Sequence, residues 1–169
     1  MKTLQEYCKL QTEKILSINP KAIPLQDLLG GPNQEVLGFE AFYRIITFTG
    51  SRSITKRDQV YRVLDQMIEA YAKKRILKMD MLWVMGEARG IDNTIANYAR
   101  MAEVPYTIIP ALWEIHGKKA GILRNQVMVD FADVVVGFWD GISPGTKHCL
   151  DYAQKQNKRV HCFTMDLNN

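Results

Sequence analysis

The chain has 169 residues, of which 47% are hydrophobic and 24% are charged, and its formal net charge is +4. These values are ordinary for a soluble globular protein, and the length favours one compact domain. A net charge of +4 is compatible with an anionic ligand, but it is too small to indicate nucleic-acid binding.

Cysteine usage and apolar runs exclude further classes. Cys8, Cys149 and Cys162 are odd in number and show no paired spacing, which is typical of reduced thiols in the cytosol. The sequence has no CxxC pair and only three scattered histidines, so it predicts no metal site and no bound cofactor. The amphipathic start does not resemble a signal peptide, and no apolar run reaches transmembrane length. We therefore expect a cytoplasmic protein.

Residues 1–40 are predicted to stand apart from the main domain. Apolar residues at helical spacing, among them Leu4, Cys8 and Ile15, predict a helix over residues 3–18. A connector rich in proline and glycine follows, and the main domain covers residues 41–169. The helix is expected to cover an edge of that domain or to support a homodimer.

The main domain alternates strands with helices. The patterns predict strands over residues 43–48, 81–85, 106–109, 133–138 and 160–163, and helices over residues 56–77, 92–102, 120–131 and 146–156. Continuous apolar strands separated by helices are typical of a parallel sheet that is covered by helices on both faces. We expect an α/β Rossmann-like three-layer sandwich with a mostly parallel five-stranded sheet in the order 3-2-1-4-5. Ligands bind such sheets at the carboxyl ends of the strands, where the strand order reverses.

Two glycine-containing loops follow the first and fourth strands, which flank that reversal. Glycine lets the backbone approach a phosphate, and the unpaired N–H groups that open a helix attract anions. Arg52 can bind phosphate through both arms of its guanidinium, although a plain turn with capping serines would explain the first loop equally simply. The predicted phosphate-binding residues are Gly50, Ser51 and Arg52 in the first loop and Asp140, Gly141, Ser143, Gly145 and Thr146 in the fourth.

The loop after the second strand carries two acidic residues, Glu87 and Asp92, between or beside Gly86, Arg89 and Gly90. Carboxylates in this place accept ribose hydroxyls in dinucleotide-binding folds, so either residue could bind a ribose. The alternative is that Asp92 simply caps the following helix. The glycine spacing is not GxGxxG, so the standard dinucleotide fingerprint is absent.

The loop after the third strand is long and contains Trp113, His116 and Lys118, which suggests a lid over the ligand. Trp113 could stack on a base or pack against the edge of the sheet. Arg124, followed by Asn125, falls early in the next helix, where a cation opposes the helix dipole. An anionic ligand would explain that position, and so would a salt bridge to Glu114 or Asp130.

Several of these segments together resemble the YspA-like branch of the SLOG superfamily. The resemblance covers about residues 43–163 and implies a Rossmann-like fold that binds a nucleotide or a nucleotide-derived ligand. Relatives in that superfamily include the lonely-guy phosphoribohydrolases and DNA-processing proteins related to DprA. The matching segments are Gly50-Ser51-Arg52, Gly86-Glu87-Ala88-Arg89-Gly90-Ile91-Asp92, His116-Gly117-Lys118-Lys119-Ala120-Gly121, Arg124-Asn125 with Met128, Ala132-Asp133, and Gly141-Ile142-Ser143-Pro144-Gly145-Thr146.

The chain departs from the phosphoribohydrolases at their catalytic glutamate. That family has the glutamate three residues after the threonine of its glycine-rich loop, where this chain has Cys149, which we expect to be a small buried residue on the helix. The favoured hypothesis is therefore nucleotide binding. A second is N-glycoside hydrolysis of nucleotides or NAD-like molecules, with Asp140, Asp92 and Glu87 as candidate catalytic carboxylates. A third, DprA-like binding of single-stranded DNA, is disfavoured by the absence of a basic stripe.

Overall fold

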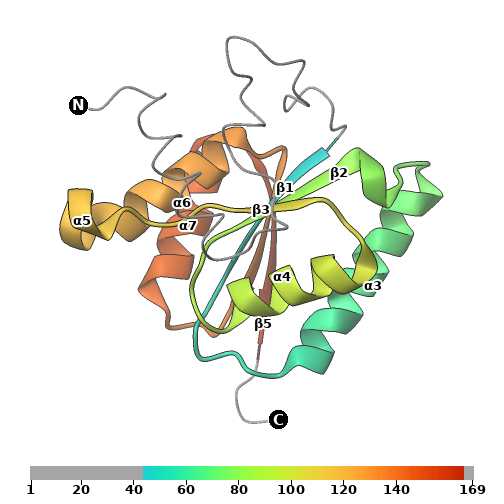
Figure 1. The fold of residues 1–169 in the computed structure, drawn as a ribbon, viewed down its shortest axis with the longest axis horizontal. Helices are drawn as coiled ribbons and strands as arrows, with labels where there is room; N and C mark the ends of the chain where they lie inside the picture. The colour runs from blue at the N-terminus through green and yellow to red at the C-terminus, as the bar shows by residue number, and fades with distance from the viewer. Residues whose placement is uncertain (1–43, 166–169) are drawn as a thin grey trace.

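In a computed structural model, residues 44–165 are described, and they form a parallel five-stranded sheet with helices on both faces (Figure 1). The strands lie in the order β3-β2-β1-β4-β5, which confirms the predicted Rossmann-like topology. The strands are β1 (Arg44–Gly50), β2 (Met81–Met85), β3 (Tyr106–Ile108), β4 (Val134–Trp139) and β5 (Arg159–Thr164). The longer helices are α3 (Arg57–Lys73), α4 (Ile91–Ala102), α6 (Ala120–Phe131) and α7 (Pro144–Lys155). The predicted helix over residues 3–18 lies outside the described residues.

The core explains why the central strands read as continuous apolar runs. Every residue of β2 is buried, because α3 and α4 cover one face of the sheet while α6 and α7 cover the other. Trp83 of β2 is fully buried and stacks on Tyr98 of α4, with ring centroids 5.8 Å apart. These contacts fix α4, and therefore the loop that precedes it, against the carboxyl end of β2.

Three local details differ from the sequence prediction. Helix α3 ends at Lys73 rather than at residue 77, because Arg75 adopts a left-handed conformation (φ 61°) that stops the helix. A short 3-10 turn, η2 (Lys78–Asp80), then leads into β2. The long loop after β3 contains a short helix, α5 (Trp113–His116), and a 3-10 turn, η3 (Gly117–Lys119). Helix α7 begins at Pro144, so Gly145 and Thr146 lie inside its first turn.

Among residues 44–165, no helix is both long enough and apolar enough to cross a bilayer. The same part of the chain contains no cluster of three histidine, cysteine or acidic side chains placed to hold a metal ion.

Candidate functional site

The loops after β1 and β4 are joined at the point where the strand order reverses. Gly50 ends β1 beside Phe138 of β4, and the Ser51 N–H donates to the Phe138 carbonyl at 3.0 Å. The buried Ser51 hydroxyl oxygen accepts the Asp140 N–H at 3.1 Å. Both bonds join residues that are far apart in sequence, so they bring the first predicted loop against the fourth.

Asp140 organises the loop that opens α7. Its Oδ1 accepts the N–H groups of Ile142 and Ser143 at 3.0 and 2.7 Å, and its Oδ2 accepts the hydroxyls of Ser53 and Ser143 at 2.6 and 2.7 Å. Desolvation acts to raise the pKa of this carboxyl, but the hydrogen bonds outweigh it and hold the pKa well below its ordinary value. Both carboxylate oxygens therefore have partners within the loops, and Asp140 stays ionised at neutral pH.

The first turn of α7 directs backbone donors into the space in front of it. Pro144 occupies the first helical position after Ser143, and Gly145 and Thr146 follow. A Cβ atom added at Gly145 would meet nothing within 4 Å, so the glycine faces open space. Helix-opening N–H groups have no partner within the helix and lie at the positive end of its dipole. This turn can therefore bind an anion, provided that other groups complete the site.

The buried guanidinium of Arg124, with the buried carboxyl group of Asp92 beside it, completes this site. Asp92, in the first turn of α4, is 6% exposed, and its Oδ2 accepts the Ala88 N–H at 3.1 Å. Arg124, on α6, is 7% exposed and donates to the Asn125 Oδ1 at 2.8 Å and to the Ile109 carbonyl at 3.2 Å. Gly86 makes room for the pair, because a Cβ there would lie 2.2 Å from Arg124 Nη1 and 2.7 Å from Asp92 Oδ2.

Burial dominates the titration of Asp92. Removal from water raises the pKa of this carboxyl from 3.8 to about 6, and the nearby charges of Arg124 and Arg52 and the Ala88 N–H only partly oppose the rise. A buried carboxyl that titrates near neutral pH beside a guanidinium is typical of a functional site. Of the two alternatives for Asp92, the one in which it is the N-cap of α4 does not hold, since Gly90 occupies the N-cap position.

A cavity of about 390 Å³ lies between these groups. A second hollow, of about 570 Å³, adjoins it and shares Arg52, Ala88, Trp113 and Arg124. Arg52, Lys118 and Arg124 line the first cavity, whereas Asp92 is its one acidic lining residue within residues 44–165. The predicted site residues that line one or both hollows are Gly50, Ser51, Arg52, Glu87, Arg89, Asp92, Trp113, Lys118, Arg124, Asn125, Ser143, Gly145 and Thr146.

The remaining predicted site residues, Gly86, Gly90, His116, Asp140 and Gly141, are not among the lining residues. Gly90 has a φ of 81° and lies against Arg52, where an added Cβ would come within 2.7 Å of the Arg52 carbonyl oxygen. Gly86 and Gly90 thus shape the loops through close packing. His116 lies at the end of α5 and is not one of the residues that surround the cavity.

The structure bears on the two alternatives that the sequence left open for Arg124 and on the two that it left open for Trp113. The hydrogen bonds of Arg124 go to Asn125 and Ile109, whereas Asp130 accepts the Tyr152 hydroxyl at 2.8 Å. Trp113 is 45% exposed at the wall of the cavity, and a Cβ at Gly121 of α6 would lie 3.3 Å from its ring. The indole therefore rests over α6 and presents area to a ligand.

Cys149 is fully buried, and burial raises the pKa of its thiol to about 11. Because a thiol with so high a pKa remains protonated at neutral pH, it is a poor nucleophile. Cys149 is therefore a small core residue, as the sequence predicts.

The sequence interpretation missed part of the lining. Gly121 and Met128 of α6 flank Arg124 and Asn125, and the spacing of these residues by three and four places them on one helical face. That spacing was the signal that could have identified them. The other missed lining residues are Thr49, Ala88, Ala111, Ile122 and Pro144.

Asp92 is expected to make stability depend on pH in an unusual direction. Between pH 3.8 and about 6 the folded state holds a proton on Asp92 that the unfolded state has lost, so stability falls as the pH rises through this range. At about 1.36 kcal/mol per pKa unit, the contribution is up to roughly 3 kcal/mol. Urea unfolding of wild type and Asp92→Asn at about pH 4.5, 5.5 and 7 measures it. Asp92→Asn should not lose stability in this way as the pH rises. If the stability of wild type and variant changes in parallel with pH, Asp92 is not the group responsible.

Comparison with known proteins identifies a family and two relatives. The family model described as "YspA, cpYpsA-related SLOG family" matches residues 44–116. The Gene 61 protein of Mycobacterium phage D29 is 37% identical over 118 residues, which cover 66% of this chain and 90% of that protein. The uncharacterized SPbeta prophage-derived protein YoqJ of Bacillus subtilis (strain 168) is 25% identical over 151 residues, which cover 81% of this chain and 84% of YoqJ. No solved structure matches significantly.

Proposed function

We propose that this chain, which belongs to the YspA, cpYpsA-related SLOG family, binds a nucleotide or a nucleotide-derived molecule. Membership of this family suggests nucleotide-related binding or glycosidase-type chemistry. The observation that carries the proposal is the meeting of the α7 first turn with Arg124 and Arg52 around one cavity. Helix-opening backbone donors and two guanidinium groups are a favourable environment for a phosphate.

The other cavity residues suggest how the rest of the ligand lies. Trp113 offers an exposed indole on which a base can stack, and Asp92 offers an acceptor for a ribose hydroxyl. The adjoining hollow, with Glu87 and Arg89 in its wall, gives room for a ligand larger than a mononucleotide. The proposed ligand thus extends from a phosphate at Gly145 towards Trp113.

Thermal unfolding in the presence of AMP, ADP, NAD, ADP-ribose or ribose 5-phosphate tests this proposal. A ligand present at about 100 times its Kd stabilises the folded state by about 2.7 kcal/mol, which raises the Tm by several degrees. Gly145→Asp is the informative variant, because its side chain enters open space and should preserve the fold while it places a negative charge at the phosphate position. Gly145→Ala is its uncharged control. Absence of stabilisation by every compound would contradict the proposal.

Catalysis is a second candidate because Asp92 is buried in the cavity with a pKa of about 6. A carboxyl with such a pKa can exchange a proton with a bound ligand or stabilise a developing positive charge on a sugar. Asp140, by contrast, uses both carboxylate oxygens for hydrogen bonds within the loops. Chromatographic detection of free base from the same compounds would identify hydrolysis, and Asp92→Asn should abolish it. Release of base at an equal rate by that variant would exclude Asp92.

A further inference from the structure

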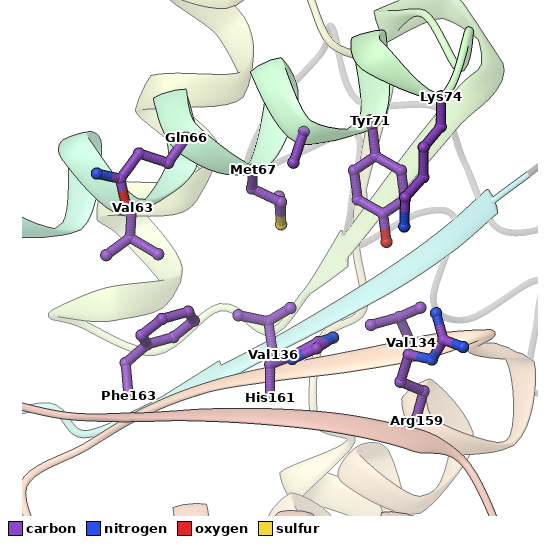
Figure 2. Close-up of a pocket in the computed structure, with 11 residues that line it drawn as sticks. Val63, Gln66, Met67, Tyr71, Lys74, Val134, Val136, Arg159, His161 and Phe163 are labelled. Atoms are coloured by element: carbon purple, nitrogen blue, oxygen red, sulfur yellow. The ribbon is translucent and has the colours of Figure 1, made fainter.

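A separate hollow of about 310 Å³ lies between α3 and the strands β4 and β5, and, among residues 44–165, none of its lining residues lines the nucleotide cavity. Figure 2 shows side chains of α3 pointing across a gap towards side chains of the two strands. Its apolar walls are formed by Val63, Met67 and Tyr71 of α3 and by Val134, Val136 and Phe163 of the strands. We call this hollow the α3–β5 groove.

The groove exists because the helices are unevenly distributed over the sheet. Helices α6 and α7 both lie on one face, where Val160 of β5 packs against the cluster that contains Cys149. On the other face α3 and α4 follow β1 and β2, so within residues 44–165 the edge strand β5 has no helix of its own there. Arg159, His161 and Phe163 therefore stay exposed on a side that is buried in the central strands.

The chain that precedes β1 joins the domain at one end of this groove. Burial raises the pKa of the Tyr71 hydroxyl; the charges of Arg44 and Arg159 act against that rise and the charge of Asp133 adds to it, so two guanidinium groups and one carboxylate lie near it. Arg44 is the first residue of β1, and Arg159 and Lys74 line the groove with Tyr71. The segment of residues 1–43 is thus attached beside the basic end of the groove.

That segment contains an amphipathic stretch that is long enough to cover the groove from end to end. Helical spacing places Leu4, Cys8 and Ile15 on one face, and Glu6 and Glu13 fall on the opposite face. A helix over residues 3–18 would be about 24 Å long, and the α3 stretch from residue 63 to residue 74 is about 17 Å long. The intervening residues 19–43, at about 3.3 Å each, can span that distance several times over.

Charge agrees with this placement. Residues 19–43 carry one lysine against three carboxylates, those of Asp27, Glu35 and Glu40. The end of the groove at which they arrive carries three cations, Arg44, Lys74 and Arg159, against one carboxylate, that of Asp133, so it remains basic. We propose that the amphipathic segment of residues 3–18 of the same chain docks in the α3–β5 groove, with its acidic connector over the basic end.

Crosslinking in the full chain tests the docking directly. Helical spacing places native Cys8 on the apolar face of the proposed helix, so a short bismaleimide should join it, within one polypeptide, to the thiol introduced by Met67→Cys in the groove. The matched control is Gln154→Cys, an exposed position on α7 on the opposite face of the sheet. Both variants carry Cys162→Ser, and peptide mass spectrometry identifies the linked residues.

The outcomes are distinct. An intramolecular link to position 67 and none to position 154 supports the proposal. A link between two polypeptides overturns it and assigns the groove to a second copy of the chain. Equal linking at both positions, or no link at either, also overturns it.

A stability comparison keeps the proposal testable if Met67→Cys fails to fold. Ile15→Asp places a charge on the face that enters the groove, and Leu10→Asp makes the same change on the opposite face. Ile15→Asp should lower the Tm by several degrees, whereas Leu10→Asp should leave it within about one degree. Equal shifts in the two variants would contradict the docking. Nucleotide binding serves as a separate readout, because the α3–β5 groove and the nucleotide cavity share none of the lining residues that the structure describes.

Discussion

Replacement of Arg124 by methionine is expected to weaken the proposed nucleotide binding by about 100-fold or more, which corresponds to roughly 2.7 kcal/mol. Arg124 is buried at the cavity wall and is oriented by Asn125 and by the Ile109 carbonyl. A guanidinium held in a site with little water gives strong, charge-assisted hydrogen bonds to a phosphate. Methionine keeps much of the volume and removes the charge, and isothermal titration with the best ligand of the panel measures the effect.

Two further variants separate this role from general electrostatics. Arg124→Lys retains the charge but loses the planar fork, so it should recover only part of the affinity. Arg52→Met removes an exposed cation from the same cavity and should have a smaller effect. Loss of the bond to Ile109 also costs about 1–3 kcal/mol of stability, so each variant is first checked by urea unfolding. Unchanged affinity in folded Arg124→Met would remove Arg124 from the binding site.

Alanine in place of Gly90 is expected to cost about 2–5 kcal/mol of unfolding free energy. Gly90 has a φ of 81°, which strains any residue with a Cβ, and that Cβ would lie 2.7 Å from the Arg52 carbonyl oxygen. The backbone strain and the collision with another backbone segment add together. Equilibrium unfolding in urea gives the difference.

The chain offers two glycines as matched controls. Gly141 has nearly the same φ, 82°, but a Cβ there meets nothing within 4 Å, so Gly141→Ala isolates the backbone strain and should cost about 1 kcal/mol. Gly145 has neither feature, so Gly145→Ala should be close to neutral. If all three variants lose the same stability, close packing of Gly90 against Arg52 is not what fixes that position.

The sheet was predictable because its signals are local. Apolar runs such as residues 81–85 read as buried parallel strands, and alternation with helices then fixes the strand order within narrow limits. The end of α3 was not predictable, because its apolar periodicity continues to residue 77 while Arg75 adopts a left-handed conformation. Short α5 was also missed, since a four-residue helix leaves too few residues for a period.

The site was predictable as a set of loops and less so as a set of roles. The position of glycines and hydroxyls after strands identifies which loops meet, because parallel strands bring their carboxyl ends to one edge. The sequence could not separate Asp140 from Asp92, since both lie where a strand gives way to the following helix. The two carboxyl groups differ in their contacts with residues that are distant in sequence. Asp140 accepts a hydrogen bond from the Ser53 hydroxyl, whereas buried Asp92 lies beside Arg124.

The hydrogen bonds between Ser51 and the β4 loop have a kinetic consequence. They connect the two walls of the proposed phosphate position to each other without any ligand. A preorganised receptor loses little conformational entropy on association, so the ordering cost falls on the incoming molecule. Its arrival should accordingly follow simple second-order kinetics, with an observed rate that rises linearly with concentration and shows no slow isomerisation plateau.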